Sequence, residues 1–170
     1  MAENIEEAED FLLDDEDVSN ENKYLLSRLG EEVYGINIAD VTEIIEMQKI
    51  TEVPDMPEYV KGVINLRGKV IPIIDLRLKF GMEEREHDNR TCIIIVSAES
   101  KTLGFIVDTV TEVIDIPEKE IAPPPKFKDT SEKEQFISGL GKVGNQVRIL
   151  LDVQRIVGSE EKETLAKLKE

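Results

Sequence analysis

Asp75 and Asp152 are the residues whose type and spacing come closest to catalytic chemistry. Each follows an apolar run that is typical of a strand. Two carboxyl groups about 5 to 10 Å apart in a cleft would suit the acid and base steps of a carbohydrate-active β protein. Each aspartate also precedes a short possible helix, where its side chain would accept backbone N–H groups as an N-cap. The pattern favours capping, and the carbohydrate-active protein remains the alternative.

Other chemistry has few candidate residues. The single histidine, His87, lies in a charged stretch, and the single cysteine, Cys92, lies in an apolar run. We expect a solvated histidine and a small core residue, since neither has partners with metal-ligand or nucleophile spacing. The sequence contains no glycine-rich phosphate loop, dinucleotide fingerprint or nucleophile elbow. It therefore predicts no enzyme, no cofactor and no metal site.

Composition excludes further classes of partner. Of 170 residues, 37 are acidic and 21 basic, which gives a formal charge of −16. Such a surface neither neutralises nucleic-acid phosphates nor attracts anionic lipid. The apolar runs are shorter than the roughly 20 residues of a membrane span. With one cysteine and no leader-like start, the sequence predicts a cytoplasmic protein that does not insert into membranes.

The acidic charge is concentrated in residues 1–21, which hold ten acidic side chains and no Lys or Arg. Self-repulsion at this density favours a solvated, disordered tail. Ile5, Ala8 and Leu12 follow helical spacing, so one amphipathic turn on a partner is the alternative.

The elements that must position these residues are mostly strands. From Lys23 onward, short β-branched and aromatic runs alternate with glycine, which is typical of an all-β protein. Four hairpins and two single strands are predicted, with a long loop over Pro117–Glu134. The hairpins cover residues 24–38, 63–74, 92–107 and 136–151, and the single strands lie near 41–47 and 110–116.

An internal repeat organises these strands. Residues 35–46 align with 104–115 and are identical at five positions, and Gly62 precedes Asp75 at the spacing by which Gly139 precedes Asp152. The duplication predicts two small five-stranded β-barrels that pack on each other. The expected divisions are a tail (1–21), a first barrel (22–80), a charged junction (81–90), a second barrel (91–157) and a C-terminal helix (158–170) capped by Ser159.

One stretch adds a family likeness. Asn65-Leu66-Arg67-Gly68, followed by an apolar strand and Asp75-Leu76-Arg77, resembles the signature of the CheW family, the adaptors of bacterial chemotaxis arrays. The likeness covers nearly all of the chain outside the tail. It continues through Lys23-Tyr24, Tyr34-Gly35-Ile36, Val41-Thr42-Glu43-Ile44, Leu103-Gly104, Ser138-Gly139-Leu140-Gly141 and Leu151-Asp152.

The resemblance implies a fold of two packed SH3-like β-barrels and a function without chemistry. The protein would connect the cytoplasmic tips of methyl-accepting chemoreceptors to the regulatory domain of the histidine kinase CheA. It would be a monomer outside the array and would be recruited to receptor arrays at the inner membrane. An adaptor of a related chemosensory pathway, such as one that controls pili, fits the same residues.

Receptor binding is expected at the seam between the barrels, where an apolar groove with polar groups at its rim would suit a helical hairpin. With the family likeness, the expected receptor-binding residues are Val41, Glu43, Ile44, Gly62, Asn65, Arg67 and Val113. The alternative makes the apolar residues ordinary barrel core, Glu43 a solvated strand residue and Arg67 a turn residue.

With the family likeness, kinase binding is expected at Lys126 and Phe127, which follow three prolines in the long loop. A proline-stiffened loop loses little entropy on docking, so it suits an aromatic anchor. The alternative is that Phe127 folds back as a lid over the second barrel.

Overall fold

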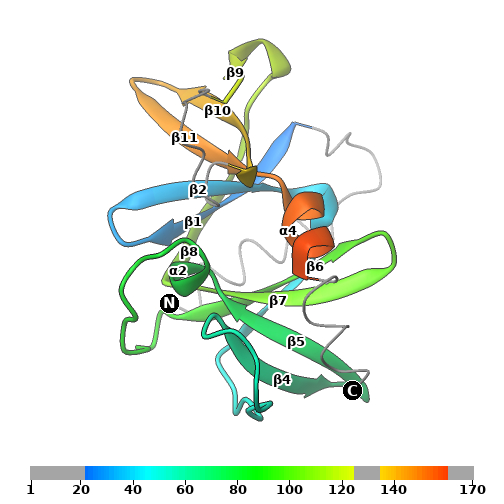
Figure 1. The fold of residues 1–170 in the computed structure, drawn as a ribbon. Coiled ribbons are helices and arrows are strands. Elements are labelled where there is room, and N and C mark those ends of the chain that lie inside the picture. Colours follow the sequence, from blue (N-terminus) through cyan, green and yellow to red (C-terminus); the bar gives the residue numbers. More distant parts are fainter. Residues whose placement is uncertain (1–21, 125–134, 161–170) are drawn as a thin grey trace.

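The computed structural model describes residues 22–124 and 135–160, and strands make up most of them (Figure 1). The strands are β1 (Lys23–Leu29), β2 (Glu32–Asn37), β3 (Val41–Glu46), β4 (Val60–Leu66), β5 (Lys69–Asp75), β6 (Cys92–Ala98), β7 (Lys101–Val107), β8 (Thr109–Asp115), β9 (Ile121–Ala122), β10 (Ile137–Val143) and β11 (Gln146–Leu151). The helices are α2 (Leu76–Lys79) and α4 (Val153–Glu160), with 3-10 turns η1 (Ile38–Asp40) and η2 (Glu118–Glu120).

Two sheets form the architecture, so the all-β prediction is confirmed. One sheet has the strand order β8-β1-β2-β11-β10-β9 and the other β3-β6-β7-β5-β4. In Figure 1, β10 and β11 lie at the top and β4 and β5 at the bottom. The first sheet has six strands rather than five because β9 forms within Pro117–Glu134, which was expected to be a loop; Ile121 and Ala122 pair with β10.

The sheets do not follow the predicted division into residues 22–80 and 91–157. The six-stranded sheet joins the first hairpin, β1 and β2, to β8–β11 from the second half of the chain. The five-stranded sheet joins the hairpin β6 and β7 to β3–β5 from the first half. Each half of the repeat therefore gives its first hairpin to the other half's sheet, and this corrects the expectation of two sequential barrels.

The exchange depends on close parallel pairing at two repeat-related glycines. Gly35 of β2 lies opposite Leu150 of β11, and Gly104 of β7 lies opposite Ile73 of β5. A Cβ atom at Gly35 would lie 2.7 Å from a Leu150 methyl carbon, and one at Gly104 would lie 2.5 Å from that of Ile73. Glycine at both positions leaves room for the Leu150 and Ile73 side chains, which a larger residue would force to move.

The core explains why the two sheets form one unit. Strand β6 is buried on both faces, and its alternating side chains enter two different clusters. Ile93 and Ile95 pack with isoleucines of the five-stranded sheet alone. Ile94 and Val96 belong to a larger cluster that also includes Leu25 and other residues of the six-stranded sheet. The sheets share this apolar layer, so neither buries its surface alone.

The helix α4 corrects the predicted C-terminal element. It begins at Val153, directly after β11, and runs through Ser159, which is therefore not its N-cap. It packs on β6 and β7 of the other sheet. Residues 161–170, like the acidic tail 1–21, lie outside the described residues. Among the helices that the structure describes, none is long and apolar enough to cross a membrane.

Candidate functional site

Asp75 and Asp152 act as helix caps, as the sequence predicted. The Asp75 Oδ1 atom accepts the Arg77 backbone N–H at 2.9 Å, and the Asp152 Oδ1 atom accepts that of Arg155 at 3.1 Å. Burial raises the pKa of Asp75, and backbone hydrogen bonds partly offset this. The two aspartates line different cavities. They do not converge as a glycosidase pair requires, so the carbohydrate-active alternative fails.

His87 and Cys92 lie where the sequence analysis expected them. His87 is exposed in the junction 81–90. Cys92 is fully buried, and burial raises the pKa of its thiol to about 12, so it is not a nucleophile at neutral pH. Within residues 22–124 and 135–160, no group of three or more His, Cys, Asp or Glu side chains could hold a metal ion.

Arg67 stands at the tip of the β4–β5 hairpin in a backbone conformation that is unusual for its type. Its φ is 51°, in the left-handed region, and Gly68 follows with φ 87°. The Asn65 Oδ1 atom accepts the Gly68 N–H at 2.8 Å and so holds the turn. The Arg67 side chain is 70% exposed. The turn thus holds a guanidinium outward at a small cost in backbone strain.

An ion pair between Arg67 and Glu43 joins the two edges of the five-stranded sheet where these edges meet and close it. Their strands, β4 and β3, are the two edges of that sheet. Just after β3, Thr51 exchanges two backbone hydrogen bonds of 2.9 Å with Val63 of β4, which brings the edges together. Gly62 permits this approach, because its φ is 140° and a Cβ there would lie 2.0 Å from the Thr51 oxygen. Gly62 is therefore a structural support for the tip.

The three apolar candidates lie beneath the surface rather than on it. Ile44 is 1% exposed and Val41 is 8% exposed, and both belong to the core that the sheets share. Val113 of β8 is partly buried and packs against the same cluster. The expectation that Ile44 lines an open groove is wrong in this structure, since side-chain alternation along β3 turns Ile44 inward.

The sequence analysis did not identify Asp108 as a residue of interest. We call Asp108 and its hydrogen-bond donors, Gly30, Arg77 and Arg85, the Asp108 cluster. The Asp108 carboxylate is 7% exposed and accepts hydrogen bonds at 2.8 Å from Arg77 Nε, Arg77 Nη2 and the Gly30 N–H, and at 3.0 Å from Arg85 Nη1. The bidentate arginine pairing is the strongest common form of ion pair. Burial alone would raise the pKa of Asp108, but these donors hold it below its usual value.

The Asp108 cluster gives the junction 81–90 a structural role. Arg77 also donates to the Glu83 carbonyl oxygen at 3.0 Å, and Lys61 of β4 pairs with Glu84. Arg85 reaches Asp108 from the same segment. The segment therefore closes over the junction of β7, β8 and α2. The dense mixture of charges in Glu83-Glu84-Arg85-Glu86 was the available signal.

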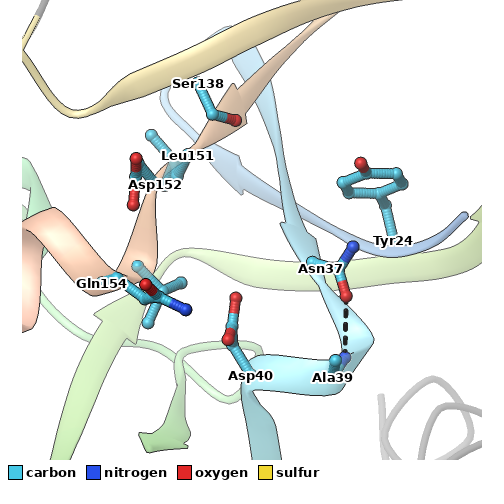
Figure 2. Close-up of a pocket in the computed structure, with 9 residues that line it drawn as sticks. Tyr24, Asn37, Ala39, Asp40, Ser138, Leu151, Asp152 and Gln154 are labelled. Atoms are coloured by element: carbon cyan, nitrogen blue, oxygen red, sulfur yellow. Dashed lines mark hydrogen bonds between the residues drawn. The ribbon is translucent and has the colours of Figure 1, made fainter. Parts of the chain in front are cut away.

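A second, open cavity lies between η1, the end of β11 and the start of α4 (Figure 2). We call it the Asp40 cavity; it measures about 470 Å³. Burial raises the pKa of Asp40, and the nearby Asp152 carboxylate adds to the effect. The cavity is lined by Tyr24, Asn37, Ala39, Asp40, Ser138, Leu151, Asp152, Val153 and Gln154.

Lys126 and Phe127, the expected kinase contacts, lie outside the described residues. The structure therefore describes neither a lid nor an anchor at Phe127. The described chain stops at Pro124 and resumes at Gln135, just before β10.

The fold and the charged hairpin tip together define the class of protein. Its two interlocked sheets present a charged hairpin tip, and the aspartate pair suspected of catalysis caps helices instead. These features define a two-sheet β protein that exposes a charged tip. A family model described as the CheW-like domain matches residues 23–161.

Known proteins agree with this class. The chain is 38% identical over 139 residues to the chemotaxis protein CheW of Klebsiella aerogenes, covering 82% of this chain and 83% of that one. It is 34% identical to that of Treponema pallidum, covering 83% and 85%. The crystal structure of the scaffolding protein TtCheW from Thermoanaerobacter tengcongensis matches with a TM-score of 0.71 and 41% identity, covering 76% and 88%. The chain belongs to the CheW family and is a chemotaxis adaptor, not an enzyme.

Proposed function

We propose that this protein couples the cytoplasmic tips of chemoreceptors to the histidine kinase CheA, and that it does so in the cytoplasm at receptor arrays of the inner membrane. The observation that carries the receptor part is the exposed Arg67 guanidinium, paired with Glu43 across the closure of the five-stranded sheet. Family membership over residues 23–161 supports the adaptor role.

The hairpin tip has the properties of a docking rim. Arg67 keeps a left-handed backbone although Asn or Gly would adopt it at lower cost, which points to a use for its side chain. The guanidinium has five donors, so it can stay paired with Glu43 and still meet acceptors on a receptor helix. Asn65 is exposed beside it and holds the turn.

The remaining candidates support this rim from below. Val41 and Ile44 fix strand β3 in the shared core, so that Glu43 keeps its place. Gly62 lets β4 approach Thr51, and Val113 packs on the same core from β8. The proposed receptor-binding region is thus one surface, Glu43, Asn65 and Arg67, on a foundation made by Val41, Ile44, Gly62 and Val113.

Calorimetric titration with a soluble receptor-tip fragment tests the receptor contact. Arg67→Glu reverses an exposed charge, so we expect an unchanged unfolding midpoint and affinity at least tenfold weaker, which is about 1.4 kcal/mol. Lys119→Glu makes the same charge reversal at an exposed position of η2 and should bind normally. Equal affinity in folded Arg67→Glu would remove this tip from the receptor site.

The kinase contact is proposed at Lys126 and Phe127. Phe127→Ala should weaken association with the regulatory domain of CheA while the denaturant midpoint stays unchanged, because an exposed anchor contributes to binding and not to the core. A lowered midpoint that corresponds to a loss of roughly 3 kcal/mol of unfolding free energy, with normal kinase binding, would instead show a buried lid.

A further inference from the structure

The Asp40 cavity and the Asp108 cluster occupy matching places in the repeat. Asp152 and Gln154, which line the cavity, stand where Asp75 and Arg77 stand in the other half of the chain. Asp75 ends β5 and Asp152 directly follows β11, and each caps the helix that comes next. The two places share their backbone plan, so their side chains can be compared. The repeat puts Ala39 at the position of Asp108, and the carboxylate of the first place comes from the next residue, Asp40.

At the Asp108 cluster the chain supplies its own cations. Arg77 makes two bonds of 2.8 Å to the Asp108 carboxylate, and Arg85 adds a third at 3.0 Å from the segment that follows α2. Lys61 pairs with Glu84 of that same segment. Every carboxylate oxygen of Asp108 is thus bonded, and the site is closed.

At the Asp40 cavity these cations are missing from the corresponding positions. Gln154 stands in place of Arg77, and Ser138 stands in place of Lys61. Asp40 has no hydrogen bond or ion pair with any described residue, although burial and Asp152 make its charge unfavourable. Arg155 pairs with Asp152 at 3.4 Å, but its side chain is 65% exposed and also donates to the Gln135 carbonyl oxygen.

We propose that the Asp40 cavity binds an arginine side chain presented by a partner polypeptide, in the way that residues 81–90 present Arg85 to Asp108. Figure 2 shows the Asp40 carboxylate pointing from η1 toward the segment that carries Asp152 and Gln154. These acceptors around one cavity suit the planar, multi-donor guanidinium, and the Tyr24 ring at its edge offers a stacking face.

The chemistry of the lining favours arginine over other cations. Asp40 and Asp152 are two carboxylates, too few for a protein metal site of three or more ligands among the described residues. A guanidinium can bond a carboxylate through two N–H groups and still donate to the Gln154 amide oxygen and the Ser138 hydroxyl. The contact goes beyond the proposed function, since its charge is opposite to that of the Arg67 tip.

Backbone NMR titration of the full chain with the peptide acetyl-Gly-Gly-Arg-Gly-Gly-amide tests the proposal. We expect saturable shifts of the Asp40 and Gln154 amides, and a dissociation constant at least tenfold higher for the same peptide with citrulline, which keeps the shape and loses the charge. Asp40→Asn should weaken arginine-peptide binding at least tenfold. Glu52→Gln, which removes an exposed charge elsewhere, should not.

A variant that places its own arginine in the Asp40 cavity provides the second measurement. Gln154→Arg restores the residue that the repeat places at Arg77, and Gln154 is exposed, so the fold should persist. The new arginine should abolish peptide binding and lower the NMR-measured pKa of Asp40, whose charge otherwise meets that of Asp152.

Three results would overturn the proposal. The first is an absence of shifts at Asp40 and Gln154 in the folded wild-type chain. The second is equal binding of the citrulline peptide. The third is peptide binding that becomes tenfold tighter after removal of residues 161–170, since the chain's own C-terminal segment would then be the occupant.

Discussion

The Asp108 cluster and the Asp40 cavity are two versions of one place in a duplicated chain. The first is closed by Arg77 and Arg85, and its carboxylate has a lowered pKa. The second has Ala39 at the position of Asp108, and the next residue, Asp40, is a half-buried carboxylate with a raised pKa and no described partner. The difference teaches that duplication conserved the backbone while one copy took a structural ion-pair network and the other kept an accessible surface.

The largest expected effect is on stability at the closed site. Asp108→Asn leaves the mostly buried Arg77 without its counter-charge, and breaking a buried pair in this way costs about 3 kcal/mol of unfolding free energy. Urea denaturation followed by circular dichroism measures it. Asp115→Asn removes an aspartate that is itself exposed and lies 3.5 Å from Lys23, and should cost well under about 1 kcal/mol. Similar losses in both variants would contradict a special role for Asp108.

The same variant sharpens the comparison through pH. Because the folded-state pKa of Asp108 is lowered, its stabilising contribution is present above the unfolded value near 3.8 and is lost as pH falls through the folded value. The gap in unfolding free energy between wild type and Asp108→Asn should therefore be constant from pH 7 to pH 5 and shrink below pH 4. A gap that stays constant down to pH 2.5 would show that Asp108 does not titrate with a lowered pKa.

A smaller effect is expected from the junction segment. Arg85→Gln removes one of the donors to Asp108, but Arg77 remains and Arg85 is half exposed, so the loss should be about 1 kcal/mol or less. Proteolysis should reveal it more clearly, as faster cleavage within residues 81–90. Unchanged cleavage would mean that the other contacts of this segment hold it without Arg85.

The smallest effect, and one of opposite sign, is expected at the open site. Asp40 has a raised folded-state pKa, so its ionised form is destabilising at neutral pH and stability rises as pH falls through that value. Asp40→Asn should raise the unfolding free energy at pH 7 by a few tenths of a kcal/mol, since the group is partly solvated. Thermal denaturation at pH 7 is sensitive enough. A destabilised variant would indicate that Asp40 has a structural partner.

Local pattern was enough to predict most strands and both helix-capping aspartates. Hairpins and caps depend on residues close in the sequence, as at Asp75 and Asp152, so their signals are legible. The exchange of hairpins between halves was not predicted, because parallel pairs such as Gly35 with Leu150 join distant segments that no short pattern specifies.

The candidate site was predicted in part for the same reason. Arg67 stands at a turn that the sequence shows, whereas its pairing with Glu43 depends on how the edges of the sheet meet. The inward position of Ile44 and the Arg85 contact with Asp108 likewise follow from tertiary packing. The residue types in the sequence identified the charged side chains. They did not show which of these side chains would already have a partner in the folded protein.

The exchanged hairpins also set an order of events during synthesis. When β6 and β7 leave the ribosome, β3–β5 have already emerged, so the five-stranded sheet can assemble at once. The first hairpin waits longer for the strands that flank it, because β8, the partner of β1, ends at Asp115 and β11, the partner of β2, ends at Leu151, far beyond Asn37 where β2 ends. At ribosomal speeds of about 5 to 20 residues per second, this wait lasts roughly ten seconds. In the nascent chain, the first hairpin is therefore complete long before the strands that flank it in the folded sheet.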